Sequence, residues 1–251
     1  MIKILAFAAS CAPENSKTEA MADKIADAIN KKAAGQGKSV EYVCVTGADV
    51  KIEYCRSCIS CFRNGICPLD SMDDCGELKR KILDCDIFLF GSPVYLWAMS
   101  GIAKSLLDRI SYWTHRFELM GKPCIVFSTT DTSCGPEVAA ELEKLMSLTG
   151  AIIINGGYST YAGMQLDPAE IAERALALYR DPASGVTMTQ QRAFLGRVLL
   201  TRKAFKQYTA DDPELWDEYK VFRERGFDRY VLLKEAMEAF CSVHNIGNDH
   251  A

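Results

Sequence analysis

Five short apolar segments alternate with longer amphipathic ones along the first 155 residues, and this alternation limits the folds open to the chain. The apolar segments are residues 2–8, 40–45, 87–90, 124–128 and 151–155. Helical patterns lie between them, over 18–34, 77–83, 101–113 and 136–148. Strands that are apolar on both faces are typical of a parallel sheet covered by helices on both sides. We therefore predict an α/β fold with a doubly wound, five-stranded parallel sheet in the flavodoxin-like order 2-1-3-4-5.

The pattern becomes entirely helical after residue 163. Asp167 and Pro168, followed by Glu170, predict a capped helix that runs to about residue 179. Two further amphipathic helices are expected over 190–208 and 213–243, the second interrupted near Gly226. We predict a flavodoxin-like domain at 1–163 and an all-helical C-terminal extension at 164–251, which packs on the domain. The middle helix is basic, which favours a solvated face, through Arg192, Arg197, Arg202, Lys203 and Lys206.

Composition restricts the classes of partner. The 251 residues are 49% hydrophobic and carry a net charge of −4, so nothing indicates a nucleic-acid partner. The N-terminal apolar run is too short for a signal peptide, and no uncharged stretch approaches the roughly 18 residues of a membrane helix. We expect a cytoplasmic protein with no membrane partner, in which cysteines stay reduced.

Four cysteines crowd into thirteen residues of the long segment 46–75. The motif is Cys55-x2-Cys58-x2-Cys61-x5-Cys67, with Pro68 directly after it. Thiolates at this spacing, with a fourth before a proline, predict a [4Fe–4S] cluster. A zinc site and redox-active or merely reduced thiols remain alternatives. The other seven cysteines are scattered: Cys44, Cys85, Cys124 and Cys241 in apolar runs, and Cys11, Cys75 and Cys134 in loops.

In the predicted sheet, the loops leaving strands 1, 3 and 4 meet at one crevice. The first loop ends at a helix N-terminus, where free N–H groups favour a phosphate. It carries neither a Rossmann fingerprint nor a P-loop, and its polar composition suits a monophosphate such as that of FMN. An N-capping Ser16 in a plain polar loop is the alternative. The candidate ligands here are Ser10, Asn15, Ser16, Lys17 and Thr18.

The other two loops can hold the flavin ring. An isoalloxazine needs flat apolar walls and a few backbone donors, which the loop after strand 3 can supply. Its candidates are Ser92, Pro93, Val94, Tyr95 and Trp97. The loop after strand 4 is small and polar and suits the polar edge of the ring, with candidates Thr129, Thr130 and Gly135.

These features together resemble a known family. The run SPVYLWAMSGIAKSLLDR over 92–109, the first strand with its Ser/Thr loop and the cysteine motif are similar to the NADPH-dependent FMN reductase superfamily, and within it to the iron–sulfur flavoproteins. The resemblance covers about 1–160. It implies FMN at the three loops, a [4Fe–4S] cluster on the four motif cysteines, and a homodimer or homotetramer. Two departures are Cys11-Ala12-Pro13 in place of Ser-Pro-Arg, and the long tail.

The resulting prediction is a flavin-dependent oxidoreductase that passes electrons between the cluster and FMN and on to a small-molecule acceptor. The electron donor is expected to be ferredoxin or NAD(P)H. None of the three histidines, His115, His244 and His250, has the context of a hydrolytic triad. Two alternatives stay open: a cluster-free NAD(P)H-dependent FMN, quinone, nitro or azo reductase, and a non-catalytic electron-transfer or redox-sensing protein.

Overall fold

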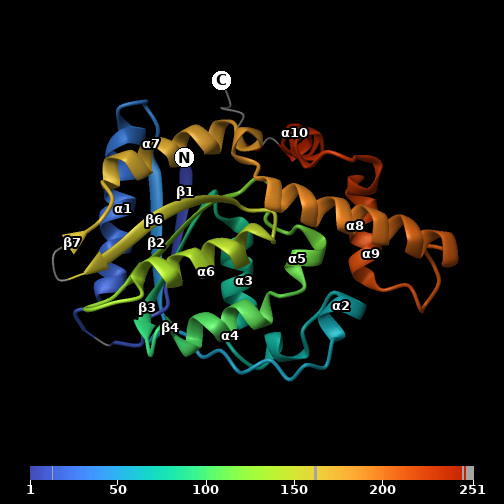
Figure 1. The fold of residues 1–251 in the computed structure, drawn as a ribbon, viewed down its shortest axis with the longest axis horizontal. Helices are drawn as coiled ribbons and strands as arrows, with labels where there is room; N and C mark the ends of the chain where they lie inside the picture. Colours follow the sequence, from blue (N-terminus) through green and yellow to red (C-terminus); the bar gives the residue numbers. More distant parts are fainter. Residues whose placement is uncertain (13, 161–162, 245, 247–251) are drawn as a thin grey trace.

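The computed structural model describes residues 1–12, 14–160, 163–244 and 246, and contains one central sheet with helices on both faces (Figure 1). Five strands are parallel, in the order β2-β1-β3-β5-β6. Their bounds are β1 Ile2–Ala8, β2 Val40–Thr46, β3 Ile87–Tyr95, β5 Pro123–Thr129 and β6 Ile152–Thr160. This is the predicted order 2-1-3-4-5, so the flavodoxin-like fold class is confirmed.

Two short antiparallel strands extend the sheet beyond the prediction. β4 (Ala98–Met99) pairs with the end of β3, and β7 (Gly163–Met164) pairs with the end of β6. A two-residue strand carries no periodicity, so the sequence could not indicate either one. Both lie where a parallel strand has run past its predicted end.

The helices cover the two faces of the sheet unequally. α1 (Lys17–Ala34) and α7 (Pro168–Arg180) pack on one face, and α3 (Cys75–Asp84), α4 (Gly101–Arg109) and α6 (Gly135–Ser147) pack on the other. Along β1 the side chains alternate between the two cores, with Phe7 in one and Ile4 in the other. The strands are therefore apolar on both faces, as predicted.

Several element boundaries were wrong. The third strand was expected to end at Phe90 but continues through Gly91 to Tyr95. Gly91 leaves space for the ring of Phe127, since a Cβ there would lie 2.2 Å from that ring. The helix predicted over 101–113 ends at Arg109, and α5 (Trp113–Arg116) follows it. The last predicted helix, 213–243, begins later than expected, at Asp217, but its predicted interruption near Gly226 is present: it separates α9 (Asp217–Glu224) from α10 (Leu233–His244).

The helices beyond α7 form a third core of their own. α8 (Met188–Gln207), α9 and α10 pack around the rings of Phe194, Phe222 and Phe227, and the domain contributes Phe117 to this core. α7 instead belongs to the sheet, since its residues 171–176 pack against α1. The domain boundary at 163/164 stays a prediction.

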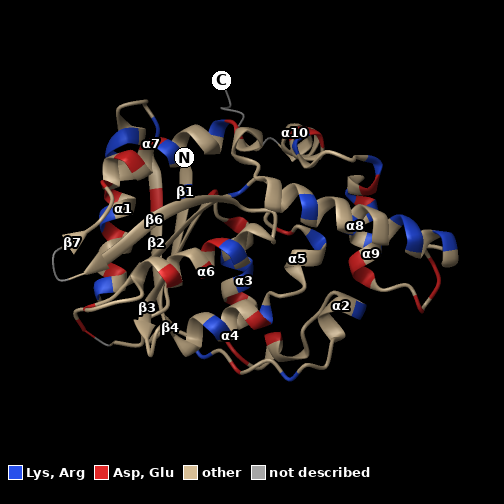
Figure 2. Ribbon diagram, viewed as in Figure 1, with Lys and Arg blue, Asp and Glu red and all other residues tan. Residues whose placement is uncertain are grey.

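Charges of both signs are interspersed over the helices, while the central strands are mostly uncharged (Figure 2). The basic helix α8 is only partly a solvated face. Arg197 is buried beside Glu218, and Arg202 donates to the carbonyl of Asp228 at 2.7 Å. Within the described residues, no helix is long and apolar enough to cross a membrane.

Candidate functional site

The four motif cysteines line one cavity of about 520 Å³, and no other described cysteine lines it. Cys67 is buried, Cys61 is half-buried, and Cys55 and Cys58 are exposed. The rest of the lining includes Phe62, Leu69 and Met72 from the same segment and Asp108 and Ser111 from the end of α4 and the turn after it.

Local backbone geometry returns the fourth cysteine to this cavity. The five residues of α2 (Ser60–Asn64) carry Cys61, and Gly65 ends the helix in the left-handed region at φ 72°. This φ is costly for any other residue type. The chain then turns back through Cys67 into a 3₁₀ turn at Pro68–Ser71. The five-residue gap between the last two cysteines therefore contains a helix end and a reversal.

The sulfurs do not form a closed zinc site. Among described residues, the only three side chains whose ligand atoms all lie within 4.8 Å of one another are Asp70, Asp73 and Cys75. A tetrahedral zinc with bonds of about 2.3 Å would place its sulfurs about 3.8 Å apart. The pKa of the Cys61 thiol is raised, mainly by burial and to a smaller extent by the neighbouring thiols of Cys67 and Cys55. Four soft donors around a cavity of this volume fit a group larger than a single ion.

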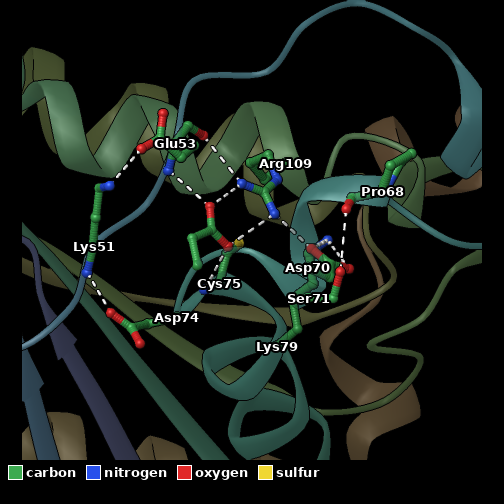
Figure 3. A network of polar contacts seen from close by, with 10 residues as sticks. Lys51, Glu53, Pro68, Asp70, Ser71, Asp74, Cys75, Lys79 and Arg109 are labelled. Atoms are coloured by element: carbon green, nitrogen blue, oxygen red, sulfur yellow. Dashed lines mark hydrogen bonds and ion pairs between the residues drawn. The ribbon is translucent and has the colours of Figure 1, made fainter.

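One buried guanidinium ties together the two ends of the cysteine loop (Figure 3). Arg109, at the end of α4, has no exposed side-chain surface. It donates to the carbonyl of Glu53 at 3.1 Å, to Asp70 at 2.7 Å and to both oxygens of Asp73. Glu53 lies two residues before the first cysteine of the motif, and Asp70 lies three after the last. Arg109 therefore fixes the distance between the two ends.

The same network is balanced in charge, and its two carboxylates accept several hydrogen bonds each, while Nε of Arg109 has no hydrogen-bond partner among the described residues. Lys79, buried in α3, donates to both oxygens of Asp70 at 2.9 Å. Asp73 also accepts from the backbone N–H groups of Glu53 at 2.8 Å and Cys75 at 3.1 Å. Burial alone would raise the pKa of Asp73, but the hydrogen bonds from Arg109 and the backbone outweigh it and lower that pKa. The carboxylates near Cys75 are thus neutralised by side-chain cations.

A second cavity, of about 260 Å³, lies where the three predicted loops meet at the ends of β1, β3 and β5. Ten of the thirteen predicted flavin residues line it. They are Ser10, Asn15, Ser16, Lys17, Thr18, Pro93, Val94, Tyr95, Thr129 and Thr130. Ala12 and Asp131 complete the lining. The convergence of these loops follows from the strand order, as expected.

Three predicted flavin residues do not line this cavity. Ser92 is buried beneath it, where its hydroxyl accepts from the backbone N–H of Ser100 at 2.9 Å and holds the start of α4. Trp97 is 77% exposed at the tip of the β3–β4 hairpin. Gly135 begins α6 and allows close packing by Tyr158, since a Cβ there would lie 2.8 Å from that ring. Their roles toward FMN stay predictions.

The N-terminus of α1 has the features of a phosphate site. Ser16 caps the helix and accepts from the backbone N–H of Glu19 at 3.2 Å. The hydroxyls of Thr18 and Thr129 are 2.7 Å apart, which joins the first loop to the third. Lys17 pairs with Asp131 across the cavity. An 18-residue helix directs its dipole and free N–H groups toward this point.

A doubly wound sheet whose loops converge on a helix N-terminus at the switch point is the arrangement of flavodoxin-like proteins. Residues 2–164 match the family described as NADPH-dependent FMN reductase, and the chain belongs to that family. It is a flavin-dependent oxidoreductase, and the family supports FMN as its cofactor.

Similar proteins carry the iron–sulfur name. The chain is 30% identical over 158 residues to an iron–sulfur flavoprotein of Archaeoglobus fulgidus. The aligned stretch covers 62% of this chain and 67% of the relative. It is 30% identical over 121 residues to an iron–sulfur flavoprotein of Methanocaldococcus jannaschii, over 48% of this chain and 58% of the relative. The chain therefore spans about two thirds or less of these relatives.

Two solved structures share the fold at low sequence identity. The apo form of the NADH:FMN oxidoreductase EmoB has a TM-score of 0.53 at 16% identity, covering 74% of this chain and 94% of that one. RosB with a bound riboflavin-phosphate intermediate has a TM-score of 0.52 at 15% identity, covering 100% and 90%. At these identities the likeness concerns the fold alone.

Sequence reasoning missed the residues that hold the cysteine loop in place. In the sequence Arg109 stands only at the end of the family-like run 92–109, and no pattern marks Asp70, Asp73 or Lys79. No spacing signal links them, because Arg109 lies 36 and 39 residues from its two acidic partners.

Proposed function

We propose that this protein is an iron–sulfur flavoprotein oxidoreductase. A [4Fe–4S] cluster would be bound by Cys55, Cys58, Cys61 and Cys67 and exchange electrons with FMN. Reduced FMN would then pass electrons to an acceptor. The supporting observation is that these four cysteines, and no other described cysteine, line a single cavity. When bound, the cluster exchanges single electrons, whereas FMN exchanges one electron or two.

The helix α4 connects the surroundings of the two cavities within one chain. Ser100 caps its start, after the β3–β4 hairpin that lines the flavin cavity through Tyr95, and donates to the carbonyl of Ala9 at 2.6 Å. Asp108, at the other end of α4, lines the cysteine cavity. Eight residues of helix span about 12 Å, so a rigid element of that length joins the two regions.

Substrates, location and assembly complete the proposal. The donor is ferredoxin or NAD(P)H, the acceptor is a small molecule, and the chain acts in the cytoplasm as a homodimer or homotetramer. Neither nucleic acid nor a membrane is a partner. The exposed hairpin tip at Tyr95, Leu96 and Trp97 offers apolar surface beside the flavin cavity for a subunit contact.

Cys58→Ser tests the cluster assignment. Anaerobically purified wild type should contain about four iron and four sulfide per chain and give a cluster EPR signal on reduction. Cys58→Ser should lose most of the iron and keep FMN, because Cys58 does not line the flavin cavity. Cys11→Ser is the matched control, since Cys11 is exposed in a loop and lines neither cavity. Wild type without iron, or a variant with full iron content, would refute the proposal.

A further inference from the structure

The helix at the centre of the cysteine loop cannot be stable by itself. α2 has only five residues, none of them buried, and its N-cap Ile59 lies in the left-handed region at φ 53°. Isolated helices shorter than about 12 residues are marginal in water. Other parts of the chain must therefore hold α2, and with it Cys61, in place.

Three consecutive residues at the start of α9 make these contacts from the C-terminal extension. The guanidinium of Arg63 in α2 lies over the ring of Trp216 at 5.3 Å. Asp217 packs against Gly65, where an added Cβ would lie 2.6 Å from the carboxylate. Asp217 is also 3.2 Å from Arg116. The extension thus contacts the last turn and the end of α2.

The third residue, Glu218, supports the wall of the cysteine cavity through a histidine. Its carboxylate is 2% exposed, accepts from Nδ1 of His115 at 2.8 Å and lies 3.0 Å from Arg197 of α8. The imidazole of His115 packs edge-on against Phe62, with ring centroids 4.9 Å apart. Phe62 follows Cys61 in the sequence and lines the cavity.

We propose that the C-terminal extension braces the cysteine loop through residues 216–218, and that Glu218 is the positioning residue which holds Cys61 at its cavity. This inference rests on the proposed function, because the cysteine loop is a cluster site only if that function holds. The bracing residues lie beyond the family match, which ends at residue 164. It assigns a task to α8 and α9: they supply a buried cation and a carboxylate that lock His115 behind Phe62. A buried carboxylate held by two partners is a rigid support, because removing it leaves Arg197 unpaired.

Amide hydrogen exchange of the full-length protein without cluster provides the first test. Glu218→Ala should speed exchange over residues 60–67 by at least about tenfold, while peptides from α1 and the flavin loops stay unchanged. Glu218→Gln should restore most of the protection, because an amide can still accept from His115. Glu224→Ala is the matched control, on an exposed acid at the far end of the same helix.

The cluster-loaded protein gives a second readout that general destabilisation would not produce. Glu218→Ala should shift the EPR line shape of the reduced cluster and release iron to a chelator severalfold faster, and Glu218→Gln should reverse both changes. If Glu218→Ala speeds exchange throughout the chain, Trp216→Ala is measured in its place. Faster exchange confined to residues 60–67 in that variant supports the brace. If residues 60–67 exchange no faster in Glu218→Ala or in Trp216→Ala than in the control Glu224→Ala, the proposed brace is refuted. Wild-type protein that binds no iron would refute the proposed function. The amide-exchange comparison would still test the brace, because it uses protein without cluster.

Discussion

Replacing Arg109 by methionine should destabilise the protein far more than the loss of an ordinary ion pair. The substitution keeps an unbranched apolar side chain but removes the cation that, alone among the described side chains, bonds to Asp73, whose side chain is fully buried. Breaking a buried pair by removing one partner costs about 3–5 kcal/mol, a large part of a typical stability of about 5–15 kcal/mol. Asp70 is affected less, because Lys79 still donates to both of its oxygens.

Urea unfolding of the protein without cluster measures this loss at pH 7. A double-mutant cycle with Asp73→Asn isolates the pair: the double variant should recover about 1–3 kcal/mol relative to the sum of the single losses. A loss below about 1 kcal/mol for Arg109→Met, the range of surface pairs, would refute the reasoning. Additive losses would show that the charge of Asp73 is not what Arg109 balances.

The Arg109–Asp73 pair also predicts how the free energy of unfolding changes with pH. Because the pKa of Asp73 is lowered in the folded state, its stabilising effect is complete above the unfolded pKa of about 3.9 and is lost as the pH falls through the folded value. The destabilisation by Arg109→Met should therefore shrink below about pH 4. A difference between wild type and variant that stays constant into acid would contradict this assignment.

Two further predictions concern the flavin side. Thr18→Val removes the 2.7 Å hydroxyl contact with Thr129 while keeping the side-chain shape, and should weaken FMN binding about tenfold without changing iron content. Fluorescence titration measures the Kd, and an unchanged value would contradict a role in the site. Leu96 and Trp97 both have positive φ, 47° and 64°, in the two-residue β3–β4 turn, so Leu96→Asn with Trp97→Gly should stabilise the protein by about 1–2 kcal/mol. Thermal unfolding checks this, and a lower Tm would show that the side chains contribute more than the strain.

The sequence was sufficient for the order of the five parallel strands and for the place where loops meet. Apolar residues on both faces of each strand require helices on both sides, and strand order then decides which loops converge. Thr18 and Thr129 lie far apart in sequence, yet the order of strands alone predicted that their loops would meet. Local pattern and topology carry this information without any knowledge of side-chain packing.

The contacts that hold the cysteine loop were beyond the same reasoning. Arg109 finds its acidic partners 36 and 39 residues away, and His115 finds Glu218 103 residues away. Each of these residues has a plausible solvated alternative in sequence terms. Only packing shows that Arg109 and Glu218 are buried.

The cysteine loop has little stabilisation of its own, and this explains where its supports lie. Two of its cysteines are exposed, α2 has no fully buried residue, and Ser57 and Ile59 both have positive φ. Such a segment keeps its conformation only if its surroundings over-determine it. Arg109 acts on the two ends of the loop from the domain, and Glu218 acts on its middle from the extension. Because both supports lie away from the flavin loops, the cysteine site can be perturbed while the flavin site stays intact.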